Sequence, residues 1–284
     1  MMNTLFNEVL EKLINAKIDS PRLETRLILA HVLNKNASDI VQNIEMTISQ
    51  KKAILSLVDK RVLGHPLDKL LGHKEFYKYD FIVDENVLSP RPDTEILVEE
   101  AINIIKNKNL SNIIDLGTGS GCIILSILKD CPLLKGVAID ISEKALEIAK
   151  ENAKKLDLTQ NIKFIKSNWF DKDFLNHINA KFDIIVTNPP YIPSDDIQTL
   201  SEEVKNHDPL LALDGGKNGF YSYEKIAEIA PALLNNGGYI CIEAGINQAD
   251  NIAKIFMNKG LIFYKIVKDL SGIDRCVILQ KPIA

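Results

Sequence analysis

At 284 residues, the chain is long enough for one large domain or two modest domains. Hydrophobic residues make up 46% of it and charged residues 25%, which is the composition of a soluble globular protein with a sizeable core. The net charge is −4, and with 11 Lys and Arg against 9 Asp and Glu in residues 1–75, the remainder is distinctly acidic. A strong basic footprint for nucleic acid is therefore missing, which argues against DNA as the main substrate.

Membrane insertion, disulfides and metal binding are also not expected. No apolar stretch has the length of a transmembrane helix, and the N-terminus lacks the apolar core of a signal peptide, so we expect a cytoplasmic location. The five histidines form no ligand-like cluster, so we expect no metal site. The four cysteines have no Cys-x-x-Cys spacing and are expected to be small buried hydrophobes in a reducing compartment: Cys122, Cys131, Cys241 and Cys276.

The first 64 residues are predicted to be helical. Ser20-Pro21 begins a helix, with a capping side chain and a proline at the first position. Another helix is predicted from Ser49, and Gly64 can end it. The apolar residues of the first segment recur at helical spacing: Phe6, Val9, Leu10, Leu13 and Ile14. We therefore predict that residues 1–75 form a small helical domain that recognises a protein substrate and is too small to hold the chemistry.

Residues 76–90 are predicted to be a linker that contains a β-hairpin. From Phe76 to Val83 the side chains alternate, which indicates a strand or hairpin. One side of it carries Tyr77, Tyr79, Phe81 and Val83. Ser89-Pro90-Arg91-Pro92 follows as a stiff, extended passage, and Asp93-Thr94 then begins a helix with good capping residues.

Strands and helices alternate through the last part of the chain, residues 91–284, which predicts an α/β fold with a mostly parallel, doubly wound sheet. Strands are expected near residues 112–116, 135–140, 162–166, 182–187, 238–244, 261–268 and 275–281. Helices are expected near residues 121–130, 142–155, 220–235 and 248–259. Because ligands bind at the carboxyl ends of strands in such sheets, the residues that directly follow strands are the first candidates for a site.

One such segment is Gly117-Thr118-Gly119-Ser120-Gly121, which follows the first predicted strand. Glycines let the loop turn tightly and let a ligand approach the backbone. The spacing G-x-G-x-G differs from the G-x-G-x-x-G of dinucleotide-binding enzymes. Asp140 ends the next strand, where a carboxylate can accept both ribose hydroxyls of a nucleoside. The loop alone fits a generic tight turn or a dehydrogenase, whereas the loop with Asp140 indicates a nucleoside-containing ligand.

A second segment, Asn188-Pro189-Pro190-Tyr191, follows the apolar run at residues 182–187. Each proline fixes its own φ and lacks an N–H, so the backbone carbonyls are held rigidly. The Asn188 side-chain oxygen and the Pro189 carbonyl can together receive both hydrogens of a planar NH2 group, which Tyr191 can cover with its ring. No His or Glu adjoins the motif to act as a general base. These residues predict a site for an amino group on a conjugated or amide system.

Together these segments resemble the HemK/PrmC-type release factor glutamine N5-methyltransferases, a family of Rossmann-like S-adenosylmethionine-dependent enzymes. The resemblance runs from about Arg61 to the end, with a looser helical match before it. Asn188–Tyr191 is shared with adenine-N6 and some guanine-N2 methyltransferases, whereas Ser89–Glu95 is more discriminating. Further matches are Ser167–Phe170, Asp208–Leu210, Ala212–Gly216, Gly237-Gly238, Glu243–Gly245, Gln248 and Gly272–Arg275. The chain departs from the family's pattern at Asn218 and near Lys69.

The resemblance implies a seven-stranded class I methyltransferase domain, with its last strand antiparallel, after the helical domain and the hairpin linker. It implies methyl transfer from S-adenosylmethionine, with S-adenosylhomocysteine as the product. The acceptor that it implies is N5 of the glutamine in the Gly-Gly-Gln motif of class I peptide chain release factors. The methylated cation is acidic enough to lose its proton to water, so no general base is required. We expect the release factor as protein partner, no membrane or stable nucleic-acid partner, and a monomer.

The resemblance also assigns roles to particular residues. The catalytic residues that it implies are Asn188, Pro189 and Tyr191. The residues that it implies for the methyl donor are Gly117, Thr118, Gly119, Ser120, Gly121, Asp140, Asn168, Trp169 and Asn188. The residues that it implies for the substrate are Arg91, Asn188, Pro189, Pro190 and Tyr191. Thr94 and Glu243 lie in matching segments but receive no role.

Several alternatives stay open at the level of sequence. The Asn188–Tyr191 slot could act on adenine N6 or guanine N2 of a nucleic acid, which would require a basic channel. The chain could instead be a non-catalytic cofactor-binding module, such as an assembly factor. Trp169 stacks on the adenine or simply packs into a surface groove. Arg91 contacts the substrate or forms a structural salt bridge.

Overall fold

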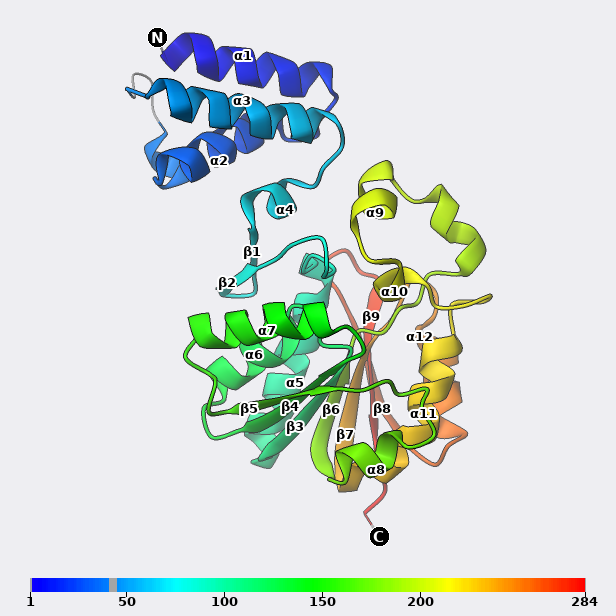
Figure 1. Cartoon of the computed structure of the whole chain (residues 1–284). Coiled ribbons are helices and arrows are strands. Elements are labelled where there is room, and N and C mark those ends of the chain that lie inside the picture. Colours follow the sequence, from blue (N-terminus) through cyan, green and yellow to red (C-terminus); the bar gives the residue numbers. More distant parts are fainter. Residues whose placement is uncertain (1, 41–44, 284) are drawn as a thin grey trace. The chain divides into compact units, whose positions relative to one another are not determined.

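The computed structural model describes residues 2–40 and 45–283 of the chain. It divides into two compact units (Figure 1). Residues 1–73 with residues 201–207 form the first unit, and residues 74–200 with residues 208–284 form the second. The last segment of the first unit, residues 201–207, thus lies in the sequence between the two parts of the second unit. The predicted domain boundaries, after residues 75 and 90, stay predictions.

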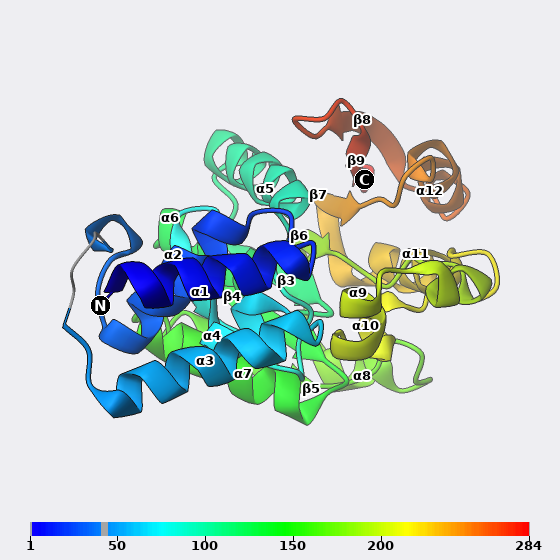
Figure 2. The ribbon, with the colours of Figure 1, turned by 90° about the horizontal axis from the view of Figure 1, so that it is seen from above.

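The first unit is built from helices, as the apolar spacing predicts. Its elements are α1 (Met2–Asn15), α2 (Pro21–Leu33), the 3-10 turn η1 (Ala37–Asp39), α3 (Ile48–Val62), α4 (Leu67–Leu71) and α9 (Glu202–His207). Figure 2 looks down on α1, α2 and α3, which pack against one another. Their buried side chains include Leu5, Val9, Leu13, Ile28, Leu29, Ile54 and Val58. Ile14, which the spacing placed on the apolar face, is exposed.

Two helix starts differ in detail from the prediction. α2 begins at Pro21, but Ser20 makes no side-chain capping hydrogen bond. α3 begins one residue before Ser49 because Thr47 forms a capping box with Gln50. Thr47 Oγ1 accepts from the Gln50 backbone N–H at 3.2 Å, and the Thr47 N–H donates to Gln50 Oε1 at 2.9 Å. Gly64 follows the helix with a φ of +93°, the left-handed conformation that favours glycine.

A buried arginine joins three segments of the first unit. Arg61 of α3 donates to both carboxylate oxygens of Glu24 on α2, at 2.7 and 3.1 Å. It also donates to Glu203 of α9 at 3.0 Å. The planar guanidinium suits this task because it presents several donors in a fixed fork. α9 is also held at His207, whose ring lies 4.3 Å from that of His65. The Lys69 ammonium donates to the His207 carbonyl.

The second unit is built on a seven-stranded sheet with the order β5-β4-β3-β6-β7-β9-β8. Its strands are β3 (Asn112–Leu116), β4 (Lys135–Asp140), β5 (Ile162–Lys166), β6 (Phe182–Thr187), β7 (Leu234–Glu243), β8 (Ile262–Lys268) and β9 (Asp274–Gln280). Strands β5, β4, β3, β6 and β7 pair in parallel, and β9 is antiparallel to both β7 and β8. The predicted α/β fold, with its doubly wound sheet and antiparallel last strand, is confirmed.

Helices cover both faces of this sheet (Figure 1). They are α5 (Glu95–Lys108), α6 (Cys122–Asp130) and α7 (Glu143–Lys155) on one face, and α8 (Phe174–Ile178), α11 (Tyr221–Leu233) and α12 (Ala249–Met257) on the other. Strand residues alternate between the two cores, with Ile113 in the first and Ile114 in the second, because side chains of a strand alternate in direction. Both cores lie below the carboxyl edge, where the loops gather. The shorter elements are η2 (Pro92–Thr94), η3 (Ser194–Thr199) and α10 (Leu210–Leu213).

The predicted hairpin is present and begins earlier than expected. It consists of β1 (His73–Phe76) and β2 (Tyr79–Ile82). Tyr77 lies in the turn with a φ of +58°, so it does not continue the side predicted for it. Asn152 of α7 bonds to both backbone groups of Ile82, accepting from its N–H at 2.7 Å and donating to its carbonyl at 3.0 Å. The hairpin is thereby fixed to the second unit.

We expect replacement of Arg61 by Ala to destabilise the first unit. Glu24 would then lose its partner while its side chain is only 14% exposed. Leaving such a carboxylate unpaired costs about 3 kcal/mol, and chemical denaturation monitored by circular dichroism would measure the loss. Arg26→Ala on the exposed side of α2 is the matched control and should change stability by about 0.5 kcal/mol or less. Equal stability of the two variants would show that the Arg61 network contributes nothing.

Candidate active site

A cavity opens at the carboxyl ends of β3, β4 and β6. The stretch from Asn86 to Arg91 lines one side of it, and the loop from Gly117 to Ser120 lines another. Asp140 ends β4, Trp169 comes after β5, and Asn188 and Pro190 come after β6, and all four line the cavity. The remaining lining residues are Thr94, Cys122, Ile123, Ile141, Ser142, Ala145, Pro209, Leu211 and Ala212. The sheet therefore brings both predicted motifs to one cavity.

The glycine loop depends on backbone conformations that side chains rarely adopt. Gly117, Gly119 and Gly121 have φ values of +79°, +54° and +80°. A Cβ added at Gly117 would lie 3.2 Å from Cη2 of Trp169, so the missing side chain also makes room for the indole. The loop is anchored to the end of β4, since the Gly119 N–H donates to Asp140 Oδ2 at 2.9 Å. These contacts present the backbone of the loop to the cavity.

Two carboxylates, those of Asp140 and Asp115, accept hydrogen bonds from this loop. Asp140 is 9% exposed and accepts a second hydrogen bond from the Ser142 N–H at 2.9 Å. Burial raises the pKa of Asp140, although these backbone bonds oppose the shift. Asp115 is fully buried and accepts from the Thr118 hydroxyl at 2.7 Å. Burial raises the pKa of Asp115 to about 7 despite that bond, and its Oδ1 has no partner among the described residues.

Trp169 and Asn168 differ in their relation to the cavity. Trp169 is 8% exposed, belongs to the core on the α11 side and also lines the cavity. Trp169 thus packs into the core and also borders the cavity, and its stacking on an adenine stays a prediction. Asn168 is absent from the described lining and stabilises the following turn instead, accepting from the Phe170 N–H at 3.0 Å.

The Asn-Pro-Pro-Tyr segment contributes unequally to the cavity. Asn188 and Pro190 line it, whereas Pro189 and Tyr191 do not belong to the described lining. Pro189 is buried, and Tyr191 is half-buried with its carbonyl accepting from Gln248 Nε2 at 3.1 Å. Burial, reinforced by the charge of Glu243, raises the pKa of Tyr191 to about 12, so this phenol stays protonated at neutral pH. The proposed catalytic roles of Pro189 and Tyr191 stay predictions.

Arg91 takes part in a salt bridge at the cavity wall. Its Nη2 lies 2.9 Å from Oδ2 of Asp208, which is the structural pairing considered from sequence. The guanidinium is nevertheless about half exposed and lines the cavity. Among the described lining residues, Arg91 and Asp140 are the charged ones, with opposite signs. The cavity wall is therefore not a basic channel.

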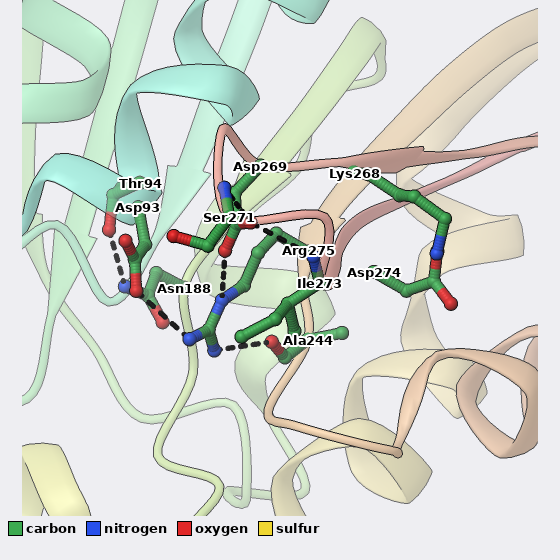
Figure 3. Close-up of polar contacts among 10 residues, drawn as sticks. All are labelled: Asp93, Thr94, Asn188, Ala244, Lys268, Asp269, Ser271, Ile273, Asp274 and Arg275. Carbon is green, nitrogen blue, oxygen red and sulfur yellow. Dashed lines mark hydrogen bonds and ion pairs between the residues drawn. The ribbon is translucent and has the colours of Figure 1, made fainter.

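Sequence reasoning missed a polar cluster behind Asn188 (Figure 3). Asn188 Nδ2 donates to the Thr94 hydroxyl at 3.4 Å. Next to it, Arg275 donates to Asp93 at 2.9 Å, to Asp269 at 3.1 Å and to the Ala244 carbonyl at 3.3 Å. The cluster also includes Glu243, whose pKa is raised by burial and lowered by hydrogen bonding with Thr94 and Asn188. A Glu therefore adjoins the motif in space, although none does so in the sequence.

Two positions that depart from the family's usual pattern have local structural roles. Asn218 Oδ1 accepts from the Phe220 N–H at 3.1 Å and so shapes the turn before α11. Lys69 binds the His207 carbonyl within the first unit. Neither residue belongs to the described cavity lining.

Within residues 2–40 and 45–283, no group of three or more His, Cys, Asp or Glu is arranged to hold a metal ion. The four cysteines are buried and unpaired. In the same ranges, no helix combines the length and apolar character that crossing a membrane requires.

The chain is similar to known proteins over almost its whole length. Residues 4–72 match the PrmC N-terminal domain, and residues 107–270 match a methyltransferase domain. A release factor glutamine methyltransferase of Agrobacterium fabrum is 38% identical, with 95% of this chain and 94% of the relative aligned. Proteins of the same name from Rhodospirillum rubrum and Fusobacterium nucleatum are 37% and 39% identical. These alignments cover 95% and 98% of this chain, and 82% and 78% of the relatives.

We expect Gly117→Ala to disturb the indole of Trp169, the single tryptophan of the chain. The new Cβ would lie 3.2 Å from the ring, and alanine would have to adopt the left-handed φ of Gly117. This conformation costs a residue with a Cβ about 1–2 kcal/mol. Intrinsic fluorescence should shift, and the thermal midpoint should fall. Gly260→Ala is the matched control, because the φ of Gly260 is +89° and nothing lies within 4 Å of the position that its Cβ would take. An unchanged spectrum in Gly117→Ala would refute the contact.

We also expect Asp115 to make the stability of the second unit depend on pH. Its folded pKa of about 7 lies above the unfolded value of about 3.9, so the folded state binds the extra proton. This contribution to stability is fully present below the unfolded pKa and is lost as pH rises through about 7. Asp115→Asn should therefore gain stability relative to the wild type between pH 5 and 8, by on the order of 2 kcal/mol. Parallel stability curves of the two proteins across this range would contradict the assignment.

Proposed function

Because this chain belongs to the release factor glutamine methyltransferase family, we propose that it methylates the side-chain amide of a release-factor glutamine, using S-adenosylmethionine. The acceptor is N5 of the glutamine in the Gly-Gly-Gln motif of class I release factors. The observation that carries this proposal is that Asn188 and the glycine loop line the same cavity. A donor and an amide acceptor can thus meet there.

The residues at the glycine loop fit S-adenosylmethionine. The bare backbone at Gly119, where nothing lies within 4 Å of the position that a Cβ would take, leaves space for the amino-acid part of the molecule. Asp140 faces the cavity beside them and can hold the ribose hydroxyls. Trp169 offers an aromatic wall for the adenine. When bound, S-adenosylmethionine supplies an electrophilic methyl group on a positively charged sulfur.

The protein's own contribution is orientation of the acceptor amide. An amide nitrogen is a weak nucleophile because its lone pair is delocalised into the carbonyl. The Asn188 side-chain oxygen and the Pro189 carbonyl accept its two hydrogens and draw electron density toward nitrogen. Fixing the amide in this geometry lowers the barrier, and the two acceptor dipoles stabilise the positive charge that develops on nitrogen. The excess proton leaves to water after transfer.

The charge at the cavity does not favour the nucleic-acid alternative. An adenine-N6 or guanine-N2 methyltransferase would need cations for the phosphate backbone. Arg91 is the cationic residue of the described lining, and it is paired with Asp208. The names of the relatives refer to release factors, not to nucleic acids. The non-catalytic alternative predicts that Asn188 is dispensable, which the following experiment decides.

We expect Asn188→Ala to lower kcat for methylation of a class I release factor about 100- to 1,000-fold. The expected size is that of losing one preorganised group at the reacting centre. The measurement is transfer of labelled methyl from S-adenosylmethionine to the release factor, followed by peptide mapping of the loop glutamine. Asn251→Ala, at an exposed position of α12, is the matched control and should keep wild-type activity.

The substrate side has its own control. A release factor with the loop glutamine changed to Ala should take up no label. Labelling of this variant, or labelling of DNA or ribosomal RNA in place of the release factor, would refute the proposed function. Wild-type activity in Asn188→Ala would refute the proposed role of the Asn-Pro-Pro-Tyr slot.

A further inference from the structure

Glu243 lies next to Asn188 because of the register of the parallel strands. Thr187 of β6 pairs with Ile242 of β7, and the next residue along each strand is Asn188 and Glu243, respectively. The Glu243 side chain is 2% exposed, and its Oε2 has no hydrogen-bond partner among the described residues. A buried carboxylate without saturated bonding is costly, so its presence at this level of the sheet calls for a role.

The chemistry of the three side chains determines which atoms donate and which accept among Glu243, Thr94 and Asn188. An ionised carboxylate can only accept hydrogen bonds, so above the pKa of Glu243 it is Thr94 that donates its hydroxyl hydrogen to Glu243. The Thr94 oxygen then has only lone pairs left for Asn188, and it accepts from Nδ2 at 3.4 Å. The lowering of the Glu243 pKa by hydrogen bonding with Asn188 also requires a donor from Asn188, which again is Nδ2. Both contacts therefore turn the NH2 end of Asn188 toward Glu243.

Arg275 places a positive charge near Glu243 and is itself held by several hydrogen bonds. Its guanidinium is 8% exposed and is held by Asp269, Asp93 and the Ala244 carbonyl (Figure 3). Burial raises the pKa of Glu243 to about 7, whereas the bond from Thr94 and the positive charge of Arg275 lower it. Above this pH the carboxylate is ionised and can act only as an acceptor.

We propose that Glu243 is a positioning residue that sets the orientation of the Asn188 side-chain amide, so that Oδ1 faces the acceptor glutamine. The proposal rests on the proposed function. The oxygen and nitrogen ends of an Asn amide have nearly the same shape, so only its hydrogen-bond network distinguishes them. With the amide reversed, Asn188 would present N–H groups to the N–H groups of the glutamine, and the slot could not hold its substrate amide.

The test compares two replacements of Glu243 at pH 8.5. Glu243→Gln keeps one acceptor oxygen and should lose about 10-fold in kcat, whereas Glu243→Met removes both and should lose about 100-fold, the scale of a misplaced reacting group. Donor affinity should change less than about 2-fold, since Glu243 is absent from the described cavity lining. Glu100→Gln is the matched control and should leave activity unchanged, because Glu100 is another buried glutamate that lies on α5 and pairs with Lys265 of β8.

Combination with Asn188→Ala separates positioning from a general structural role. If Glu243 acts through Asn188, then Glu243→Met causes no further loss in kcat once Asn188 is Ala. The very low kcat values of such variants can be measured with labelled donor, an excess of enzyme over release factor and reaction times of hours. The proposal is overturned if Glu243→Met keeps the wild-type kcat. It is also overturned if Glu243→Met lowers kcat as much in Asn188→Ala as it does in the wild type.

A measurement without donor or substrate distinguishes failure of this proposal from failure of the proposed function. The side-chain NH2 resonance of Asn188, in protein labelled with 15N at asparagine and assigned by its loss in Asn188→Ala, should shift in Glu243→Gln and stay in place in Glu100→Gln. An unmoved resonance in Glu243→Gln overturns the proposal. A wild-type enzyme that labels no release factor refutes the proposed function, and the resonance still decides whether Glu243 orients Asn188.

Discussion

The register of the parallel strands is the constraint on which the site depends. Leu116 pairs with Ile139 on one side and with Thr187 on the other, and Thr187 pairs in turn with Ile242. These four residues form one level across the sheet. The residues directly after them are Gly117, Asp140, Asn188 and Glu243. A slip of one residue in any pair would reverse the inward and outward sides of that strand, so burial of the two cores also fixes the functional edge.

Much of this edge could be predicted from the sequence, because its signals are local. A strand buried on both faces is a short apolar run, as in residues 182–187, and the residue after the run is then at the edge. Glycines at positive φ and paired prolines are likewise properties of single positions, so the loop at Gly117 and the stiff segment at Pro189-Pro190 were recognisable. The family resemblance added the order of the last strands, which local signals do not determine.

The parts that the sequence did not reveal depend on residues far apart in the chain. Thr94 and Glu243 meet only because η2 and the end of β7 come to the same corner, and neither residue has a local pattern that indicates a partner. The placement of α9 in the first unit is similar, since six residues without a clear apolar face give no signal of their own. Ser20 shows the opposite error, because a residue well suited to capping makes no capping bond.

The position of α9 also bears on how such a protein can be divided. The chain passes between the two units three times, after residues 73, 200 and 207. The helical unit is therefore not a detachable prefix, since a fragment that starts at residue 74 would still carry α9 without Glu24, Arg61 and His65 around it. Exchange of recognition domains between relatives, in the laboratory or by recombination of genes, has to move residues 201–207 together with the first 73. Modularity at the level of the fold thus does not correspond to a single cut in the coding sequence.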